Sequence, residues 1–456
     1  MSSPEPRKQA VRFQAPKGTR DFFPPEMAVR RHIERAWREA SVCFGFDEVD
    51  GPTFEHLELY TVKSGQGIVS ELFSFRRQGG ESDYALRPEF TPTLARMVAA
   101  RGAQLPQPIK WFAMPSFFRA ERPQRGRLRE FLQWNVDLLG VAGATVDAEV
   151  IGVAVNALER LGLTAKDVRV KVSHRVAAAR LVRSLGVADG SVAAAFELLD
   201  RRDKMEPDEF RTRAGALGLQ ADALERFERT VRARTPVSEG LAALAQGAGV
   251  PVEELADLEA LRVALMAAGM ADWCEFDLGI VRGLAYYTGT VFEIHEASGA
   301  ERAIAGGGRY DGLVEMFGGP ATPAMGFGMG DVVLGLVLAD RGLLPKDGAE
   351  LLPRPDAFVI SAGDPQAEER LPTLCAELRR AGLHVRHSYK ATRNVGKLLA
   401  DASRCRARCA VILGAELAQG MVQMKDLSTG EQRSVAAVDV LAELRRARAA
   451  EHGGAL

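Results

Sequence analysis

Apolar residues recur at helical spacing in two segments of the first third of the chain. Val29, Ile33 and Trp37 fall four residues apart, and two prolines at 24–25 suit the first turn of a helix. A second helix is predicted over residues 145–162, where Gly162 can end it. Its apolar face comprises Val146, Val150, Val153, Ala157, Leu158 and Leu161.

β-Forming residues dominate other segments and predict strands. Residues 44–54 have this character, but Gly51-Pro52 interrupts them, so an edge strand or a special join is expected there. From about 166 to 270 the chain is rich in Ala, Leu, Glu and Arg with helical periodicity, which predicts a helical insertion. The other predicted strands are residues 110–118, 130–138 and 273–280, and a helix is expected at 334–343.

The last hundred residues read as a separate unit, because strands and helices alternate after a proline-rich linker near residues 351–356. This alternation is typical of a small parallel α/β domain. The predicted strands are 357–361, 383–386 and 410–414, the predicted helices are 368–381 and 395–402, and a hairpin and a final helix follow.

Composition narrows the class of protein. The chain has 456 residues, 46% hydrophobic and 26% charged, which suits a globular protein of two to four domains. A formal charge of -1 means that any nucleic-acid contact must come from local basic patches. The five cysteines are scattered, and the Cys405/Cys409 pair lacks a second pair for zinc. No run of eighteen apolar residues occurs, so a cytoplasmic location is expected.

Residues 282–293 combine a cation with hydrogen-bonding aromatic side chains. They read Arg-Gly-Leu-Ala-Tyr-Tyr-Thr-Gly-Thr-Val-Phe-Glu, and a strand over this stretch would place Tyr286 and Tyr287 on opposite faces. The permanently charged guanidinium of Arg282 beside these tyrosines suits an anionic, hydrogen-bonding ligand. The alternative is an ordinary sheet strand whose arginine reaches into solvent.

A second charged segment, residues 119–133, holds five arginines within eleven positions, broken by Pro123 and Gly126. Arg119 and Glu121 are two apart and would point the same way on a strand, offering a fork to a phosphate. The remaining arginines suit phosphate contacts with a nucleic acid. A solvated basic hairpin is the alternative.

These segments together resemble histidyl-tRNA synthetases. Residues 282–287 match the family's Arg-Gly-Leu-Asp-Tyr-Tyr, with Ala285 in place of aspartate, and residues 119–133 look like motif 2 of class II synthetases. Residues 86–96 match a third segment, and the Gly51-Pro52 join resembles motif 1, which implies a homodimer. The resemblance runs from Lys17 to about Leu444.

The resemblance implies a fold and a division of the chain. The fold is α/β, with a class II antiparallel sheet flanked by helices, a helical insertion and a small C-terminal α/β domain similar to anticodon-binding domains. The expected parts are a tail (1–16), the catalytic core (17–165 and 271–345), the insertion (166–270), a linker (346–355) and the anticodon-binding domain (356–450). The implied activity is histidine–tRNA ligation with ATP and Mg²⁺, and tRNA as partner.

The family's functional residues carry over position by position. Arg119 and Arg282 match the catalytic cations, and Asp137 stands where a glutamate is commoner. The implied histidine-binding residues are Glu89, Thr91, Gln133, Asp137, Tyr286, Tyr287 and Tyr310. The implied ATP-binding residues are Arg119, Glu121, Arg127, Phe131, Gly328 and Gly330, and the implied tRNA-binding residues are Arg122, Arg125, Arg393 and Lys397.

Motif 3 matches only in part, because Val332 and Val333 occupy the places of the family's Glu-Arg pair. Asp331, just before them, is the nearest carboxylate and is either a magnesium ligand or a helix N-cap. The missing pair leaves two other functions open. One is a histidine-sensing regulatory subunit of ATP phosphoribosyltransferase without catalysis, and the other is an RNA-binding regulatory module.

Overall fold

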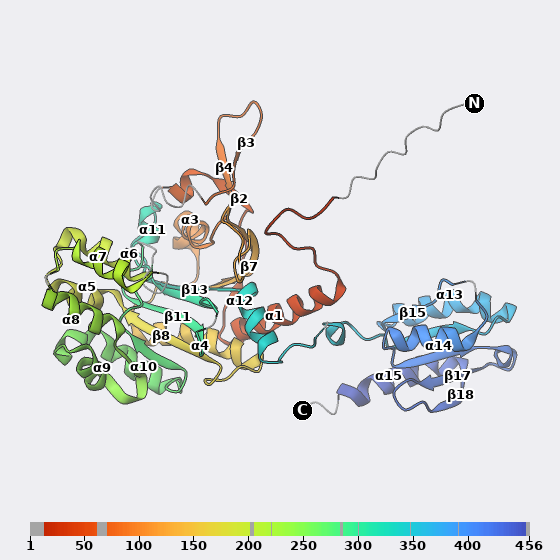
Figure 1. Ribbon diagram of the computed structural model, residues 1–456. Helices are drawn as coiled ribbons and strands as arrows, with labels where there is room; N and C mark the ends of the chain where they lie inside the picture. Colours follow the sequence, from red (N-terminus) through yellow and green to blue (C-terminus); the bar gives the residue numbers. More distant parts are fainter. Residues whose placement is uncertain are drawn as a thin grey trace, which may run out of the picture. The chain divides into compact units, whose positions relative to one another are not determined.

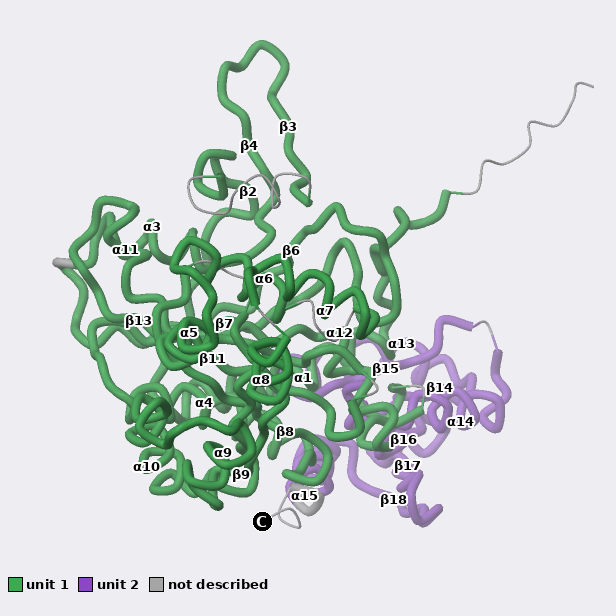
Figure 2. The backbone as a smooth tube through the Cα atoms, turned by 60° about the vertical axis from the view of Figure 1, so that its left-hand side comes forward, with its two compact units in different colours: residues 1–351 green, residues 352–456 purple. Residues whose placement is uncertain are grey.

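The computed structural model describes residues 13–61, 71–200, 205–219, 221–282, 286–299, 301–346, 348–390 and 392–452. The chain divides into two compact units, residues 1–351 and 352–456 (Figures 1 and 2). The division falls inside the segment predicted as a linker. Gly283 and Ala285, which belong to the signature segment, lie outside the described residues.

A ten-stranded sheet forms the centre of the first unit. Its order is β1-β5-β7-β13-β12-β11-β8-β10-β9, with β6 paired to β7. All pairs are antiparallel except β1 with β5 and β8 with β10. The strands are β1 (Asp47–Glu48), β5 (Ile109–Ala113), β6 (Ser116–Phe118), β7 (Glu130–Leu139), β8 (Val168–His174), β9 (Arg234–Pro236), β10 (Cys274–Asp277), β11 (Thr290–Glu296), β12 (Ala305–Arg309) and β13 (Ala324–Gly330).

Helices cover both faces of this sheet. On one face α1, α4 and α12 enclose a large apolar core, in which the rings of Trp37 and Trp134 stack 5.8 Å apart. On the other face, α3 and α11 pack over a second core that includes Tyr286, Tyr287 and Tyr310 (Figure 1). The helices are α1 (Pro24–Cys43), α3 (Thr91–Arg101), α4 (Ala144–Arg160), α11 (Leu313–Met316) and α12 (Asp331–Asp340).

The segment predicted as a helical insertion is not wholly helical. β8 lies inside it and pairs with β10 and β11 in the central sheet, so the helices begin only at Arg175. Val168, Val170 and Val172 are fully buried and alternate with polar residues, a strand pattern masked by the Ala-rich helices that follow. Those helices are α5 (Arg175–Ser184), α6 (Val192–Asp200), α7 (Pro207–Gly215), α8 (Ala221–Arg232), α9 (Gly240–Ala248) and α10 (Glu259–Ala267).

The predicted interruption at Gly51-Pro52 separates two strands of different sheets. β1 before it is the edge of the central sheet. β2 (Phe54–His56) after it joins β4 (Asp83–Leu86) and β3 (Ser74–Arg76) in a three-stranded sheet.

The second unit has the predicted alternating architecture. Its sheet order is β15-β14-β16-β17-β18, with β14 parallel to both neighbours and β17 antiparallel to both of its own. The elements are β14 (Ala357–Ser361), α13 (Pro365–Arg380), β15 (Val385–His387), α14 (Val395–Arg404), β16 (Cys409–Leu413), β17 (Met421–Asp426), β18 (Gln432–Ala436) and α15 (Val440–His452). Across the described ranges of both units, every helix is too short or too polar for a membrane crossing.

Candidate active site and nucleic-acid interface

A pocket opens on the α3 face of the central sheet. It gathers residues from six parts of the chain: the start of α3, the segment after β6, the strand β7, the signature segment, and the strands β12 and β13 with the residue after β12. Its lining includes Glu89, Thr91, Arg119, Gln133, Arg282, Tyr286, Tyr287, Tyr310 and Gly328, all of them predicted site residues. The structure therefore brings together, in one cavity, residues that are up to 239 positions apart (89 to 328).

The predicted placement of the two tyrosines is wrong. Tyr286 and Tyr287 line the same pocket, and their rings lie 4.9 Å apart. β11 begins only at Thr290, so neither tyrosine obeys the alternation of a strand. Residues 286–289 precede β11 and are not part of a strand, so the alternation of side chains between two faces does not apply to them.

Glycines form the floor of the pocket. A Cβ atom at Gly326 would overlap the carboxylate of Asp137, and one at Gly328 would overlap the amide of Gln133. A Cβ atom at Gly306 would likewise overlap the guanidinium of Arg282. The glycines of β12 and β13 thus leave room for polar side chains to lie flat on the sheet.

Two tyrosine–carboxyl pairs lie at the pocket, although Asp137, unlike the other three residues of these pairs, does not line it. The hydroxyl of Tyr286 donates to Glu89 Oε2 at 3.0 Å, while Glu89 Oε1 is buried without a partner in the described chain. The hydroxyl of Tyr310 donates to Asp137 Oδ1 at 2.6 Å. Burial raises the pKa of Glu89, against the opposing effect of Arg119, and raises the pKa of Asp137 to about 7.

Gln133 and Asp137 share one face of β7, as their spacing predicts, and pair with β13 opposite Gly330 and Gly326. Gln133 Nε2 donates to Asn135 Oδ1 at 3.0 Å. Asn135 also lines the pocket and was not predicted, although its position on the same face of β7 was a sufficient signal.

Arg282 is held by an acidic partner that sequence reasoning did not assign to the site. Its NH1 donates to Glu293 Oε1 at 2.6 Å, and the other oxygen of Glu293 lies 2.7 Å from His295 Nε2. Burial opposes ionisation of both partners, but their mutual attraction is stronger and holds the pKa of Glu293 at about 2. Arg282 Nε is buried without a partner in the described residues, so this guanidinium retains a donor for a ligand.

Arg119 and Glu121 lie just beyond β6 rather than within a strand, which corrects the predicted strand geometry. Arg119 Nε donates to the carbonyl of Pro88 at 3.1 Å, and its guanidinium lies 5.1 Å from the centre of the Phe131 ring. Glu121 is buried and forms an ion pair with Arg127.

A further arginine, Arg302, belongs to the same cluster and was missed by sequence reasoning. A Cβ atom at Gly126 would lie 3.3 Å from Val333 Cγ2 and 3.8 Å from Arg302 Cδ. The neighbouring Glu301 accepts from Arg125 Nε at 2.7 Å, which ties this segment to the arginine-rich loop. Burial and the charges of Arg127 and Arg119 lower the pKa of Arg302, so like charges converge here.

Asp331 is not the N-cap of α12. Gly330 occupies that position, and Asp331 is the first helical residue. Its Oδ1 accepts from the backbone N–H of Leu132 at 3.0 Å, and its Oδ2 accepts from Arg20 NH2 at 2.6 Å. Both oxygens of Asp331 therefore have partners that tie α12 to β7 and to the N-terminal segment.

Gly330 is not part of the pocket lining, unlike Gly328.

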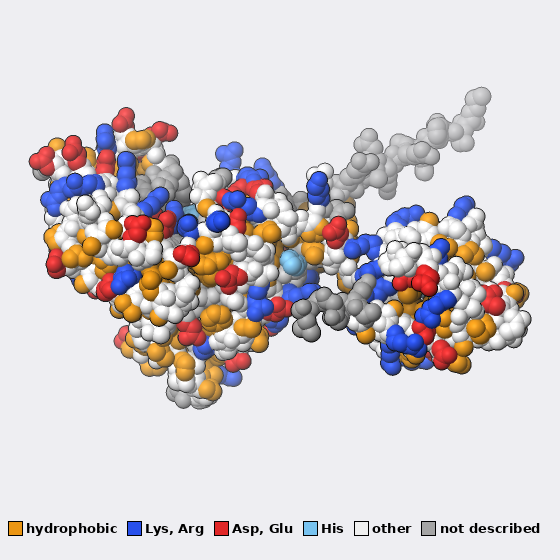
Figure 3. Space-filling model, turned by 90° about the horizontal axis from the view of Figure 1, so that it is seen from below, with side chains coloured by type: hydrophobic (Ala, Val, Ile, Leu, Met, Phe, Trp, Pro, Cys, Tyr) orange, Lys and Arg blue, Asp and Glu red, His pale blue; other side chains and the backbone are white. Residues whose placement is uncertain are grey.

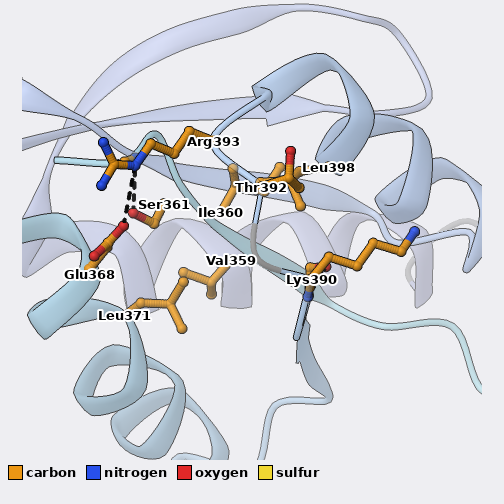
Figure 4. Close-up of a pocket in the computed structure, with 11 residues that line it drawn as sticks. Val359, Ile360, Ser361, Glu368, Leu371, Lys390, Thr392, Arg393 and Leu398 are labelled. Atoms are coloured by element: carbon orange, nitrogen blue, oxygen red, sulfur yellow. Dashed lines mark hydrogen bonds and ion pairs between the residues drawn. The ribbon is translucent and has the colours of Figure 1, made fainter.

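A second cavity, of about 340 Å³, lies in the C-terminal unit. It is lined by the end of β14, the start of α13, residues that follow β15 and the start of α14; Figure 4 shows the side chains that line it. Ser361, Lys390 and Arg393 contribute polar groups, and Arg393 Nε lies 4.0 Å from Glu368 Oε1. Lys397 is in the first turn of α14 beside this cavity.

The surroundings of this cavity are basic and exposed. Tyr389 is 89% exposed, with its ring 4.4 Å from that of His387. Asp401 accepts from both Lys390 and Arg404. Figure 3 shows Lys and Arg side chains spread over the surface of this unit, with Asp and Glu between them.

Comparison with known proteins links these two sites to one family. Residues 18–330 match the family model "Histidyl-tRNA synthetase", and residues 356–447 match "Anticodon binding domain". The chain is 39% identical to a histidine–tRNA ligase of Opitutus terrae, over 95% of this chain and 98% of that one. It is 40% identical to a histidine–tRNA ligase of Halobacterium salinarum, over 91% and 94% of the two chains.

Solved structures have the same architecture. A histidyl-tRNA synthetase from Nostoc superposes with a TM-score of 0.77 at 26% identity, covering 96% of this chain and 100% of that one. A Bacillus halodurans protein described as an ATP phosphoribosyltransferase regulatory subunit/histidyl-tRNA synthetase has a TM-score of 0.70 at 24% identity, covering 89% and 100%. At that identity the second likeness shows the fold alone.

Proposed function

The chain belongs to the histidyl-tRNA synthetase family and has histidine–tRNA ligase activity, and from this premise we propose how its residues divide the work. The single observation that carries the assignment is the pocket on the glycine floor. There Glu89, Tyr286 and the half-buried cation Arg282 line one cavity, and Tyr310, which also lines it, donates to Asp137. This combination supplies acceptors for an ammonium and an imidazole together with a donor for an anion.

We propose that the pocket holds histidine in a fixed orientation. Glu89, whose Oε1 has no partner in the described chain, accepts from the α-ammonium with the help of Thr91 and Gln133. Asp137 and Tyr310 bind the imidazole, and Tyr286 and Tyr287 enclose it. Leaving one such buried polar group unpaired costs about 1–3 kcal/mol, so the set selects histidine over amino acids with apolar side chains.

In the reaction itself the histidine carboxylate attacks the α-phosphorus of ATP, which displaces pyrophosphate and forms histidyl-adenylate. A hydroxyl of the terminal ribose of tRNA then attacks the histidyl carbonyl carbon and AMP leaves. The chain contributes position and charge: Arg282 and Arg119 stabilise negative charge at the transferring group. No protein nucleophile is needed.

The residues around the arginine-rich loop fit a polyphosphate. Three guanidinium groups, of Arg119, Arg127 and Arg302, lie near the carboxylate of Glu121, which also has the carboxyl group of Glu71 as a neighbour. Arg302 has no hydrogen bond or ion pair within the described ranges, so its charge is available for a ligand. We propose that Arg302 supplies the cation absent at Val333, that Phe131 stacks on the base, and that Gly328 gives room for the nucleotide.

The side chains do not fit a metal ion bound by the protein. Among the residues that the structure describes, no three His, Cys, Asp or Glu side chains gather around one point. Both oxygens of Asp331, the predicted magnesium ligand, already have partners. A magnesium ion brought in by ATP would keep phosphate and water oxygens as its main ligands.

For tRNA we propose two contact regions. In the first unit, Arg122 is exposed, and no ion pair engages it within the described residues. Arg125, predicted with it, is 64% exposed but pairs with Glu301. In the second unit, Arg393 and Lys397 contact anticodon phosphates while the cavity admits a base and Tyr389 stacks on another.

We propose that the protein is a homodimer. Phe54 and Phe75 are 48% and 44% exposed on the three-stranded sheet, and both rings contact Tyr84. An exposed aromatic cluster of this kind is a common interface feature, and twofold dimers are the commonest oligomers. Light scattering at micromolar protein should give about twice the 49.4 kDa chain mass, and a fully active monomer would contradict the proposal.

Pyrophosphate exchange that requires both histidine and ATP tests the proposed function. A synthetase exchanges label only with both substrates, whereas a histidine sensor binds histidine without exchange. An RNA-binding regulatory module binds tRNA without either reaction. The lost motif 3 pair favours the sensor, but the matched anticodon-binding domain at 356–447 favours the synthetase.

A further inference from the structure

The backbone of Arg282 has a conformation that arginine rarely adopts. Its φ is 58°, in the left-handed region, where a side chain crowds the backbone. Only Arg406 shares this feature among the non-glycine residues in the described part of the chain. Such a conformation persists at a functional residue when surrounding contacts hold it.

The backbone at Arg282 is contacted by one residue of the helical insertion, Arg175. The NH1 of Arg175 donates to the carbonyl of Val281 and to the carbonyl of Arg282, each at 3.1 Å. The backbone N–H of Arg175 donates to the carbonyl of Gly289 at 2.9 Å. Arg175 therefore binds the chain both where it enters and where it leaves the signature segment.

Arg175 is itself fixed by its place in the fold. It is the first residue of α5 and directly follows β8, whose His174 pairs with Thr290 at the start of β11. Its guanidinium lies 4.8 Å from the centre of the Phe196 ring on α6. Phe196 and Val281 belong to one apolar cluster with the helices α5 to α8, so the insertion packs against the residue that precedes Arg282.

We propose that Arg175 is a positioning residue, which holds the left-handed backbone of Arg282 and so aims its guanidinium into the pocket. The inference rests on the proposed role of Arg282 in adenylation. Arg175 does not line the pocket; it acts through the carbonyls of residues 281 and 282. Through this contact, the packing of the helical insertion determines the geometry of the catalytic cation.

Loss of Arg175 should therefore affect the transition state more than substrate binding. Without its two hydrogen bonds, Arg282 can relax toward an ordinary conformation and move its guanidinium away from Glu293. The histidine contacts of Glu89 and Asp137 come from other segments and remain. We expect Arg175→Ala to lower kcat for pyrophosphate exchange at least tenfold, with histidine Kd changed less than threefold.

Two variants of the full chain make the test specific. Arg175→Lys retains a cationic donor and should recover most of the activity. Arg180→Ala is the matched control, because Arg180 lies on the same helix but contacts the carbonyl of Glu254 and the carboxylate of Asp257 instead. Its kcat should stay near that of the unmodified protein.

A double-mutant cycle separates the two roles. If Arg175 acts through Arg282, then Arg175→Ala should cause no further loss in an Arg282→Ala background. Full additivity, near-normal kcat of Arg175→Ala, or equal losses in Arg175→Ala and Arg180→Ala would each overturn the inference. If Arg175→Ala does not fold, Arg175→Lys and Arg175→Gln replace it in the test. A fully active Arg175→Lys and an inactive Arg175→Gln that binds histidine normally would support the inference. Equal activity of these two variants would refute it. A harmless Arg282→Ala would instead overturn the proposed function.

Discussion

The pocket of the first unit and the cavity of the second both present cations to a ligand, but by opposite physical means. Arg282 is 22% exposed and is fixed by Glu293 and by the hydrogen bonds that Arg175 donates to the carbonyls of Val281 and Arg282. Arg393 is 78% exposed, and its nearest acid is 4.0 Å away. A buried, oriented cation can discriminate a transition state, whereas exposed cations contribute salt-dependent attraction. The two regions should therefore fail differently when altered.

The largest effect is expected at Arg282. Arg282→Ala should lower the single-turnover rate of adenylate formation by about 100-fold or more, the scale of one lost preorganised donor. Histidine KM should change little, because Glu89, Asp137 and Tyr310, which we propose to bind the polar groups of histidine, lie on other segments. Rapid-quench kinetics with saturating histidine and ATP provide the measurement. Near-normal adenylation in this variant would remove Arg282 from the catalytic group.

Histidine affinity should depend on pH in a way that identifies Asp137. Its pKa is about 7 in the free protein, and free imidazole has a pKa of about 6.5. The complex holds one proton between the two groups. Above pH 7 neither free partner carries it, so binding must take up a proton. Below about 6.5 both carry one, and binding must release a proton.

Affinity should consequently peak between about pH 6.5 and 7 and fall toward tenfold per pH unit on each side. Calorimetry from pH 5.5 to 8.5 measures this profile. Asp137→Asn should abolish the alkaline fall, and Asp137→Ala should weaken binding at least tenfold at neutral pH. An unchanged alkaline fall in Asp137→Asn would exclude Asp137 as the titrating group.

The proposal that Arg302 replaces the motif 3 arginine can be tested by removing the charge at residue 302 and restoring a charge at residue 333. Arg302→Ala should raise the KM for ATP about tenfold, equivalent to about 1.4 kcal/mol, since one of three converging guanidinium groups is lost. Adding Val333→Arg to this variant should restore much of the affinity, because both side chains lie beside Gly126. Arg160→Ala is the control, because the guanidinium of Arg160 pairs with Glu39 and not with residues of the arginine-rich loop. If Arg302→Ala leaves the KM for ATP unchanged and Val333→Arg does not lower it, Arg302 does not contribute to ATP binding.

Sequence reasoning succeeded where local geometry decides position. Gln133 and Asp137 share a face because β7 is a regular strand, and the period of two placed them correctly. It failed for Tyr286 and Tyr287, because β11 begins only at Thr290 and both tyrosines precede it. β8 was missed because its alternation is short beside long helical segments. Arg175 and Arg302 were missed for another reason: their contacts join segments far apart in sequence, which no local pattern reveals.

Substitutions at the cavity of the second unit should weaken tRNA binding only modestly, and the size of their effect should depend on the salt concentration. The double variant Arg393→Ala/Lys397→Ala should raise the KM for tRNA about fivefold at low salt, while pyrophosphate exchange stays unchanged. Loss of two phosphate contacts should also flatten the dependence of log KM on log salt by roughly 1.4. Arg370→Ala, an arginine of α13 paired with Glu377, is the control in the same unit. An equal salt slope in all three proteins would argue against anticodon contacts at this site.

The smallest kinetic effect is expected at Asp331, whose carboxylate is buried like the pocket residues but serves structure. Its two oxygens join α12 to the backbone of Leu132 and to Arg20, so neither is free for a metal ion. Asp331→Asn should therefore leave the magnesium titration of pyrophosphate exchange superimposed on that of the unmodified protein. The same change should lower the free energy of unfolding by about 1–3 kcal/mol in urea, because a charged hydrogen bond to Arg20 is weakened. Arg20→Ala should cause a similar loss of stability through the same contact. A magnesium requirement that rises in Asp331→Asn but not in Arg20→Ala would instead identify Asp331 as a ligand, and would show that ATP binding displaces Arg20.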